Sequence, residues 1–236
     1  MGGQEKKTLA RVYDKLFSSL GPQHWWPGET PFEVAVGAIL TQNTAWSNAS
    51  MAVQELKRLK LLDPRRLEKI PQRRLARIIR SSGYFNQKAK RLKIFVRHLN
   101  RRYGGRMSQM RGGLAEPLRK ELLSLWGIGP ETADSILLYA LEKPVFVVDA
   151  YTRRILARHG LIPWNATYQQ IQDLFHSMPG QGRTRAARYN EYHALIVETG
   201  KKLCRVHPDC FSCPLRRVGN LKLEPGASIR SKMLKK

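Results

Sequence analysis

The segment from residue 122 to residue 156 constrains the fold of this chain more than any other. It reads LLSLWGIGPETADSILLYALEKPVFVVDAYTRRIL. Apolar residues at helical spacing occupy Leu118–Leu125 and Glu131–Leu141, on either side of Trp126–Pro130. Gly127 and Gly129 can adopt positive φ and leave no Cβ over the backbone amides, and proline suits the first turn of a helix. The segment therefore predicts two helices joined by a tight hairpin.

The hairpin also predicts an anion site, because backbone amides at a helix N-terminus bind anions and phosphate is the natural candidate. A glycine-capped turn in any helical protein is the plainer interpretation of Gly-x-Gly. Thr132, which follows the hairpin, and Asp149, which lies downstream, favour the phosphate interpretation.

Asp149 ends a short apolar run, Pro144–Val148. A carboxylate in that position is expected to be at least half buried, which costs several kcal/mol unless it is paired or hydrogen-bonded. Aspartate is also a favoured N-cap, here for a helix over residues 150–158. Capping and catalysis are compatible roles for this side chain.

The charge of the chain indicates its partner. Lys and Arg number 42 against 18 Asp and Glu, giving a net charge of +24. Such an excess favours a polyanion, nucleic acid above an anionic membrane, although a merely soluble basic protein is the alternative. No apolar run reaches the roughly 18 residues of a membrane span, and the N-terminal residues do not resemble a secretion signal. Three cysteines clustered near one end are not a disulfide framework, so a cytoplasmic location is expected.

Helical periodicity dominates the rest of the chain, and the predicted fold class is all-α. A strand period occurs only at Val145–Val148, and Gly104–Gly113 is expected to be a mobile loop. Helices are expected at residues 8–20, 31–42, 45–59, 65–69, 72–81, 88–103, 118–125, 131–141, 150–159, 168–178 and 186–202.

With its hairpin and downstream aspartate, the chain resembles the helix-hairpin-helix DNA glycosylases of the endonuclease III superfamily. The likeness extends to Leu40–Thr44, Gly83–Ala89 and His193–Cys213, and covers most of residues 10–215. It implies two helical domains flanking a DNA-binding cleft. Residues 30–138 would form the domain with the helix-hairpin-helix motif, and residues 1–29 plus 139–236 the domain with a cysteine loop and basic tail.

The resemblance implies a base-excision repair enzyme, expected to be a monomer, that flips a damaged base out of double-stranded DNA and hydrolyses its N-glycosidic bond. A fixed carboxylate stabilises the positive charge that develops on the sugar and can orient water, which makes Asp149 the candidate catalytic residue. Gln42 would enter the gap left by the base, and the Tyr84-Phe85 loop would act as a wedge. The expected hairpin contacts to DNA are Gly127, Ile128, Gly129 and Thr132.

Glu131 departs from one part of this pattern. Family members that also cut the strand carry a lysine at this position, immediately before Thr-Ala, and its amine forms a Schiff base with the sugar. Glutamate cannot form an imine. The resemblance therefore implies a monofunctional enzyme that leaves an abasic site, unless a different lysine substitutes.

The tryptophans indicate the 3-methyladenine DNA glycosylase branch, which the chain resembles at Trp25-Trp26-Pro27, at residues 41–46 and at Glu131–Asp134. The resemblance assigns Trp25, Trp26, Pro27, Trp46 and Lys201 to the base pocket. In that branch the positions of Trp25 and Trp46 sandwich the flipped base, and Lys201 matches a lysine near the pocket. An alkylated adenine is cationic, and an aromatic face favours a cation by roughly 0.5–2 kcal/mol. Core packing is the alternative for these tryptophans. A second, modified lysine of that branch corresponds to Leu195 here.

The C-terminal cysteines, Cys204, Cys210 and Cys213, have spacings that resemble the loop of the [4Fe–4S] members of the superfamily. Those members carry a fourth cysteine about six residues further on, where this chain has Arg216–Asn220. His207 is the only nearby alternative ligand in the sequence. Either three cysteines and an unusual ligand hold a cluster, or the cluster has been lost.

Two other functions stay open at this point. One is an endonuclease III-like glycosylase and abasic-site lyase acting on oxidised pyrimidines, against which Glu131 and the tryptophans argue. The other is a non-catalytic helix-hairpin-helix DNA-binding module, which would not need the carboxylate of Asp149.

Overall fold

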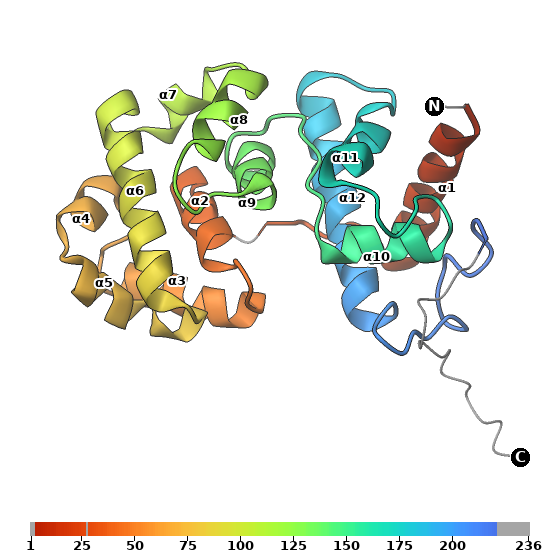
Figure 1. Cartoon of the computed structure of the whole chain (residues 1–236), viewed down its shortest axis with the longest axis horizontal. Coiled ribbons are helices and arrows are strands. Elements are labelled where there is room, and N and C mark those ends of the chain that lie inside the picture. The colour runs from red at the N-terminus through yellow and green to blue at the C-terminus, as the bar shows by residue number, and fades with distance from the viewer. Residues whose placement is uncertain (1–2, 27, 221–236) are drawn as a thin grey trace, which may run out of the picture. The chain divides into compact units, whose positions relative to one another are not determined.

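The structure is a computed structural model that describes residues 3–26 and 28–220. Pro27, assigned above to the base pocket, and the basic tail over residues 221–236 lie outside the described residues. Every regular element in the described part of the chain is helical, which confirms the all-α prediction (Figure 1). No helix among these residues is long and apolar enough to cross a membrane.

The helices follow the apolar periodicity closely. In chain order they are α1 (Gly3–Leu20), α2 (Pro31–Leu40), α3 (Trp46–Arg58), α4 (Pro64–Lys69), α5 (Gln72–Ile78), η1 (Arg80–Ser82), α6 (Phe85–Tyr103), α7 (Met107–Arg111), α8 (Ala115–Leu123), α9 (Pro130–Ser135), η2 (Ile136–Ala140), α10 (Ala150–Arg158), α11 (Tyr168–His176) and α12 (Gly182–Lys202).

The chain divides into two compact units. The middle unit is Trp26–Pro144, and the split unit joins Met1–Trp25 to Val145–Lys236. The predicted boundaries lay at residues 29/30 and 138/139, so the middle unit is longer than expected at both ends. The added residues include Trp26 and Tyr139, whose rings pack against each other with centroids 5.0 Å apart. This contact holds the first residue of the middle unit to its core.

Helix α2 is the core of the middle unit, and every residue from Phe32 to Leu40 is buried. Thr30 caps it by accepting a hydrogen bond from the amide of Glu33. The buried Glu33 carboxylate is paired with Lys57 of α3 at 2.8 Å, which satisfies its charge. Helices α3, α6, α9 and η2 all pack against α2.

The split unit is built on α12, which packs against α1 and α10. Tyr192 of α12 is fully buried, and its hydroxyl donates a hydrogen bond to the carbonyl of Leu9 at 2.9 Å. Phe146 and Phe175 stack with centroids 3.5 Å apart and complete this core. The N-terminal helix is thus fastened to a helix that begins more than 160 residues later in the chain.

The stretch with a strand period, Val145–Val148, is extended but has no partner strand in the described chain. Side chains of α11 satisfy its backbone instead. The amide of Phe146 donates to Nε2 of His176 at 3.2 Å, and its carbonyl accepts from Nε2 of Gln172 at 2.7 Å. The amide of Val148 donates to the hydroxyl of Tyr168 at 3.3 Å. Because these side chains satisfy its backbone polar groups, the apolar segment can be buried without belonging to a sheet.

Two further expectations need correction. Residues 104–113 were expected to be a loop, but α7 forms within them because Met107 and Met110 are both buried on the core. The predicted helix over residues 131–141 changes at Ile136 to the wider π form, in which Leu141 bonds the carbonyl of Ile136 at 3.1 Å. Such π segments are frequent at functional sites.

Candidate functional site

The hairpin between α8 and α9 has the predicted form. Gly127 lies at φ +82, and Gly129, the N-cap of α9, has an ordinary extended φ of −91, so only Gly127 requires glycine for its backbone. The amide of Ile128 donates to the carbonyl of Leu125 and closes the turn. The side chain of Ile128 is buried. Any contact of this residue with a ligand must therefore come from its backbone.

Gln42 holds the hairpin in place. Its side-chain amide donates to the carbonyl of Gly127 at 3.0 Å and to the hydroxyl of Thr132 at 2.8 Å. Its carbonyl oxygen accepts from Arg91 at 2.5 Å. A Cβ on Gly127 would come within 2.6 Å of the Arg91 side chain, so the glycine is also required by this close approach. The predicted gap-filling side chain is thus committed to the hairpin in this structure, and the next residue, Asn43, is the exposed amide at the end of α2.

An ion pair joins the two helices of the motif. Asp134 of α9 is fully buried and accepts from Nε and Nη2 of Arg119 of α8, at 2.6 and 3.0 Å. Bidentate pairing of this kind fixes orientation as well as charge. Asp134, noted in the sequence as part of Glu131–Asp134, therefore has a structural role here.

The expected wedge loop is exposed and strained. Tyr84 has φ +44, a left-handed conformation that is unusual for an aromatic residue, and 67% of its surface is exposed. Phe85, which begins α6, is only partly exposed. Strain of this kind clusters at functional positions.

Lys88 anchors that loop. Its buried ammonium donates to the carbonyls of Leu40 at 2.8 Å and Ser82 at 2.5 Å, tying the loop to the end of α2. Burial lowers the pKa of Lys88 to about 8, with a smaller contribution from Arg91. Lys88, which lies within the Gly83–Ala89 stretch of the family likeness, therefore has a structural role.

Three aromatic rings cluster in the middle unit. Trp26 meets Trp46 edge-on, with centroids 5.0 Å apart and an interplanar angle of 79°, and it also packs on Tyr139 of η2. A Cβ at Gly37 would lie 3.3 Å from the Trp46 ring and 3.5 Å from Nε1 of Trp26, so this glycine leaves room for both. The described ring partner of Trp46 is therefore Trp26.

Trp25 belongs to the split unit, where it accompanies Lys201. The Lys201 ammonium lies over its ring, 5.1 Å from the centroid. The structure brings together these two of the predicted pocket residues, which are 176 positions apart in the chain. The contact also indicates that this tryptophan face accepts a cation.

Asp149 caps α10, and its Oδ1 accepts from the amide of Thr152 at 2.7 Å. Its Oδ2 lies 3.6 Å from Nε2 of His193 on α12. Burial lowers the pKa of His193; Asp149 opposes that effect and Lys201 adds to it. Burial therefore favours the neutral form of the imidazole beside Asp149. Sequence reasoning missed His193 because nothing in its spacing from Asp149 marks it.

Glu131, at the position of the lyase lysine, is exposed in the first turn of α9. An acidic residue there interacts favourably with the positive end of the helix. Its backbone carbonyl accepts from the hydroxyl of Ser135 at 2.7 Å.

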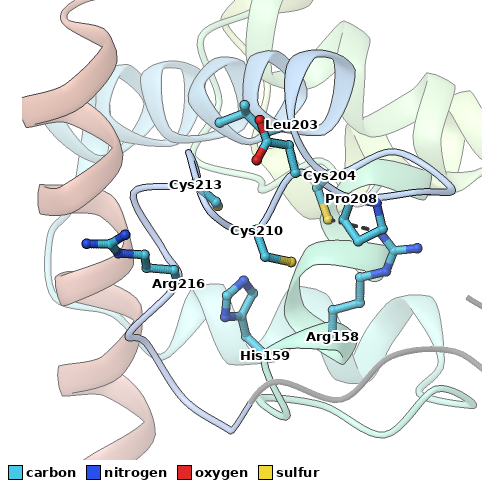
Figure 2. A pocket seen from close by; sticks show the side chains of 9 residues that line it. Arg158, His159, Leu203, Cys204, Pro208, Cys210, Cys213 and Arg216 are labelled. Carbon is cyan, nitrogen blue, oxygen red and sulfur yellow. Dashed lines mark hydrogen bonds between the residues drawn. The ribbon is translucent and has the colours of Figure 1, made fainter. Parts of the chain in front are cut away.

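The three cysteines lie in the loop after α12, and Cys204 and Cys213 are buried. They line one small pocket together with His159 and Arg158 of the α10 end, as Figure 2 shows. Burial raises the pKa of Cys213 to about 11 and also raises that of Cys210. Across the residues that the structure describes, no three His, Cys, Asp or Glu side chains are placed to hold a metal ion. His207 is exposed and does not line the pocket, so it is not the nearby alternative that the sequence indicated.

The family model and the relatives that this chain resembles are those of DNA repair proteins. A family model described as the HhH-GPD superfamily base excision DNA repair protein matches residues 36–179. A Methanocaldococcus jannaschii protein assigned as a DNA repair glycosylase is 44% identical over 89% of this chain and 94% of its own length. The endonuclease III of Thermotoga maritima is 28% identical over 79% of this chain and 81% of its own length.

Solved structures agree with these relatives. The H. pylori 3-methyladenine DNA glycosylase bound to 1,N6-ethenoadenine is similar with a TM-score of 0.72 and 28% identity, over 84% of this chain and 97% of the other. A trapped endonuclease III–DNA covalent intermediate matches with a TM-score of 0.77 over 90% of this chain and 94% of the other; at 21% identity it shows the shared fold alone. The chain belongs to the HhH-GPD superfamily of base excision DNA repair proteins, as a DNA N-glycosylase of endonuclease III type.

Proposed function

We propose that this glycosylase releases alkylated purines of the 3-methyladenine type from double-stranded DNA and leaves an uncut abasic strand. The proposal rests on the surroundings of Asp149. Its carboxylate caps the start of α10 and lies 3.6 Å from the imidazole of His193, whose neutral form burial favours. The similarity to the H. pylori enzyme bound to 1,N6-ethenoadenine supports a purine substrate.

Asp149 is the proposed catalytic residue. Departure of the base leaves positive charge on the sugar, and a fixed carboxylate stabilises that charge. The bond from the Thr152 amide fixes one carboxylate oxygen. A protonated histidine beside the other oxygen would offset its charge, and burial of His193 disfavours that state. Alkylated purines are cationic and leave readily, so a carboxylate without a general acid is enough for them.

The proposed base pocket consists of the aromatic residues and one lysine. Trp25 offers a face that already accepts the Lys201 ammonium, and a cationic base would use the same attraction, worth roughly 0.5–2 kcal/mol. Trp26 and Trp46 supply the further rings of the proposal. Pro27 keeps the place that the sequence resemblance gives it.

DNA would be held by the hairpin and opened by the loop before α6. The amides beside Gly127, Gly129 and Thr132 would bind backbone phosphate. The amide of Ile128, which also donates to the carbonyl of Leu125, would lie next to them. The exposed ring of Tyr84, followed by Phe85, would act as the wedge, and an apolar tip suits the cost of unstacking a base step. Gln42 or its neighbour Asn43 would fill the gap that the base leaves. The protein would bind as a monomer.

Glu131 underlies the proposal that the enzyme is monofunctional. A Schiff base requires an amine, and the residue at the lyase position is a carboxylate. Borohydride should therefore not trap the wild-type protein on DNA with an abasic site. A Glu131→Lys variant should gain trapping, because the amine would stand where the family's nicking members carry it.

The test of the proposal is release of bases from methylated duplex DNA, followed by chromatography. Wild type should release 3-methyladenine with strands intact until heated in alkali. Asp149→Asn should be slower by about 10²–10³-fold, as for loss of one electrostatic stabiliser. Asn caps a helix as well as Asp, so this change spares α10.

Asp63→Asn is the matched control. Asp63 caps α4 in the same manner, accepting from the amide of Arg66 at 2.8 Å. Its loss should leave release unchanged. Failure to release alkylated bases, with cutting at an oxidised pyrimidine instead, would replace the proposal by the endonuclease III-like alternative that several relatives' names favour. Tight DNA binding by a wild type that releases no base from either substrate would favour the binding module.

A further inference from the structure

In the cysteine loop, a glycine occupies the position at which the spacing of the iron–sulfur members would place a fourth cysteine. Gly219 lies six residues after Cys213 and adopts φ +64. A Cβ at this position would lie 2.2 Å from the carbonyl oxygen of His159. No residue with a side chain, cysteine included, fits there while His159 keeps its place. The position of His159 is therefore incompatible with a fourth cysteine at residue 219.

A hydrogen bond at Nδ1 of His159 holds the ring and leaves Nε2 as the potential metal ligand. Its Nδ1 lies 2.7 Å from the carbonyl of Val218. Because a carbonyl oxygen only accepts, Nδ1 carries the proton and Nε2 keeps its lone pair. The amide of Asn220 also donates to the carbonyl of His159 at 3.1 Å. Metal-binding histidines commonly have their other nitrogen held by a carbonyl in this way.

The pocket beside this ring offers the remaining ligands. Cys204, Cys210 and Cys213 line it, and Arg158 and Arg216 line it too (Figure 2). Nη1 of Arg158 donates to Sγ of Cys204 at 3.4 Å. Cationic neighbours and N–H donors to sulfur suit a group that carries several thiolates. The donor set is therefore three thiols and one imidazole, and two arginines and the carboxylate of Asp209 also line the pocket.

The spacing of the cysteines along the chain favours a cluster over a single ion. Cys204, Cys210 and Cys213 keep the spacing of the iron–sulfur loop, and His159 lines the same pocket. A cubane cluster binds its four ligands at separate irons, so its ligands stand further apart than those of one zinc ion. We infer that Cys204, Cys210, Cys213 and His159 bind a [4Fe–4S] cluster, with His159 in place of the fourth cysteine.

This assignment has a chemical consequence. A neutral imidazole donates less negative charge to iron than a thiolate, and replacing cysteine by histidine raises the reduction potential of iron–sulfur centres. The site lies in the loop after α12 and takes no part in the proposed reaction of Asp149. The assignment therefore stands or falls separately from the alkylpurine proposal.

The experiment is anaerobic purification of the full chain with iron supplied during expression. Wild type should hold about four irons and four sulfides per chain, with the visible absorption of a cubane cluster. Isotope-labelled histidine should give a nitrogen coupling in pulsed paramagnetic resonance of the reduced cluster. His159→Ala should lose most of the iron, and His207→Ala, at the exposed histidine, should lose none.

His159→Cys keeps the test decisive if the alanine variant fails to fold. It should hold the cluster, lose the nitrogen coupling and show a lower reduction potential. Wild-type protein without iron and sulfide, or holding zinc alone, overturns the inference. A full cluster in His159→Ala, or an unchanged spectrum and potential in His159→Cys, overturns it equally. Base release measured on the same preparations reports on the alkylpurine proposal alone.

Discussion

Oδ2 of Asp149 lies 3.6 Å from Nε2 of His193, whose buried ring also feels the charge of Lys201. Burial lowers the pKa of His193 below its ordinary 6.5. The folded protein then binds fewer protons than the unfolded chain as pH falls below 6.5. The stability associated with neutral His193 is complete above that pH and is lost on acidification below it.

The first prediction concerns this titration. Followed by NMR of the histidine ring, His193 should titrate below 6.5 in wild type. Asp149→Asn should lower its pKa further, because the carboxylate favours the charged ring. Lys201→Met should raise it, because the ammonium disfavours that charge. Shifts of the opposite sign in the two variants would contradict the electrostatic account of this pair.

The second prediction separates Gln42 from Asn43. Gln42→Ala should lower the free energy of unfolding by about 1–3 kcal/mol, because the Gly127 carbonyl and the Thr132 hydroxyl lose their donor. Asn43→Gly suits the left-handed φ of +51 and should change stability by less than about 0.5 kcal/mol. Urea titration measures both. If Asn43→Gly slows base release while folding normally, the exposed amide fills the gap in DNA.

The third prediction tests the ion pair inside the helix-hairpin-helix motif. Asp134→Ala should destabilise the protein by about 3–5 kcal/mol, because the Arg119 guanidinium loses a fully buried bidentate partner. Glu116→Ala removes an exposed partner of Lys120 on the same helix and should cost less than about 1 kcal/mol. If the two variants lose the same amount of stability in thermal unfolding, the buried Asp134–Arg119 pair matters no more to stability than the exposed pair.

The fourth prediction concerns Tyr84 in the loop before α6. Tyr84→Gly relieves a left-handed conformation, worth about 1–2 kcal/mol, but adds backbone entropy to the unfolded chain. Stability should stay equal or rise slightly, while affinity for duplex DNA with an abasic site falls. Tyr84→Phe keeps the apolar ring and should bind normally. Full affinity in the glycine variant would remove Tyr84 from the proposed wedge.

The sequence was a good guide wherever apolar periodicity decides the structure. The predicted helices are present, and the hairpin glycine has the expected positive φ at Gly127. Periodicity failed at α7, where two buried methionines sit among Gly, Ser and Arg, and at Val145–Val148, whose backbone bonds to side chains of α11.

The direction of a polar side chain was harder to predict. Nothing in the sequence distinguishes Gln42, which turns toward the hairpin, from the exposed Asn43 beside it. His159 lies 45 residues before Cys204, so spacing within the cysteine loop pointed to His207 instead. Both placements depend on tertiary contacts, since each side chain finds its partners on a different segment of the chain.

The split unit also orders events during synthesis. Helix α1 is made before the other described helices, and its partners α11 and α12 are completed only at residues 176 and 202. All described helices of the middle unit have been made by residue 140, so this unit can pack before the partners of α1 exist. During synthesis the chain therefore consists of a folded middle unit and an amphipathic helix α1 that still lacks its packing partners. The apolar face of α1 (Leu9, Val12 and Leu16), which is buried in the complete protein, is exposed at that stage. Truncation before residue 168 would remove both α11 and α12 and leave that face exposed.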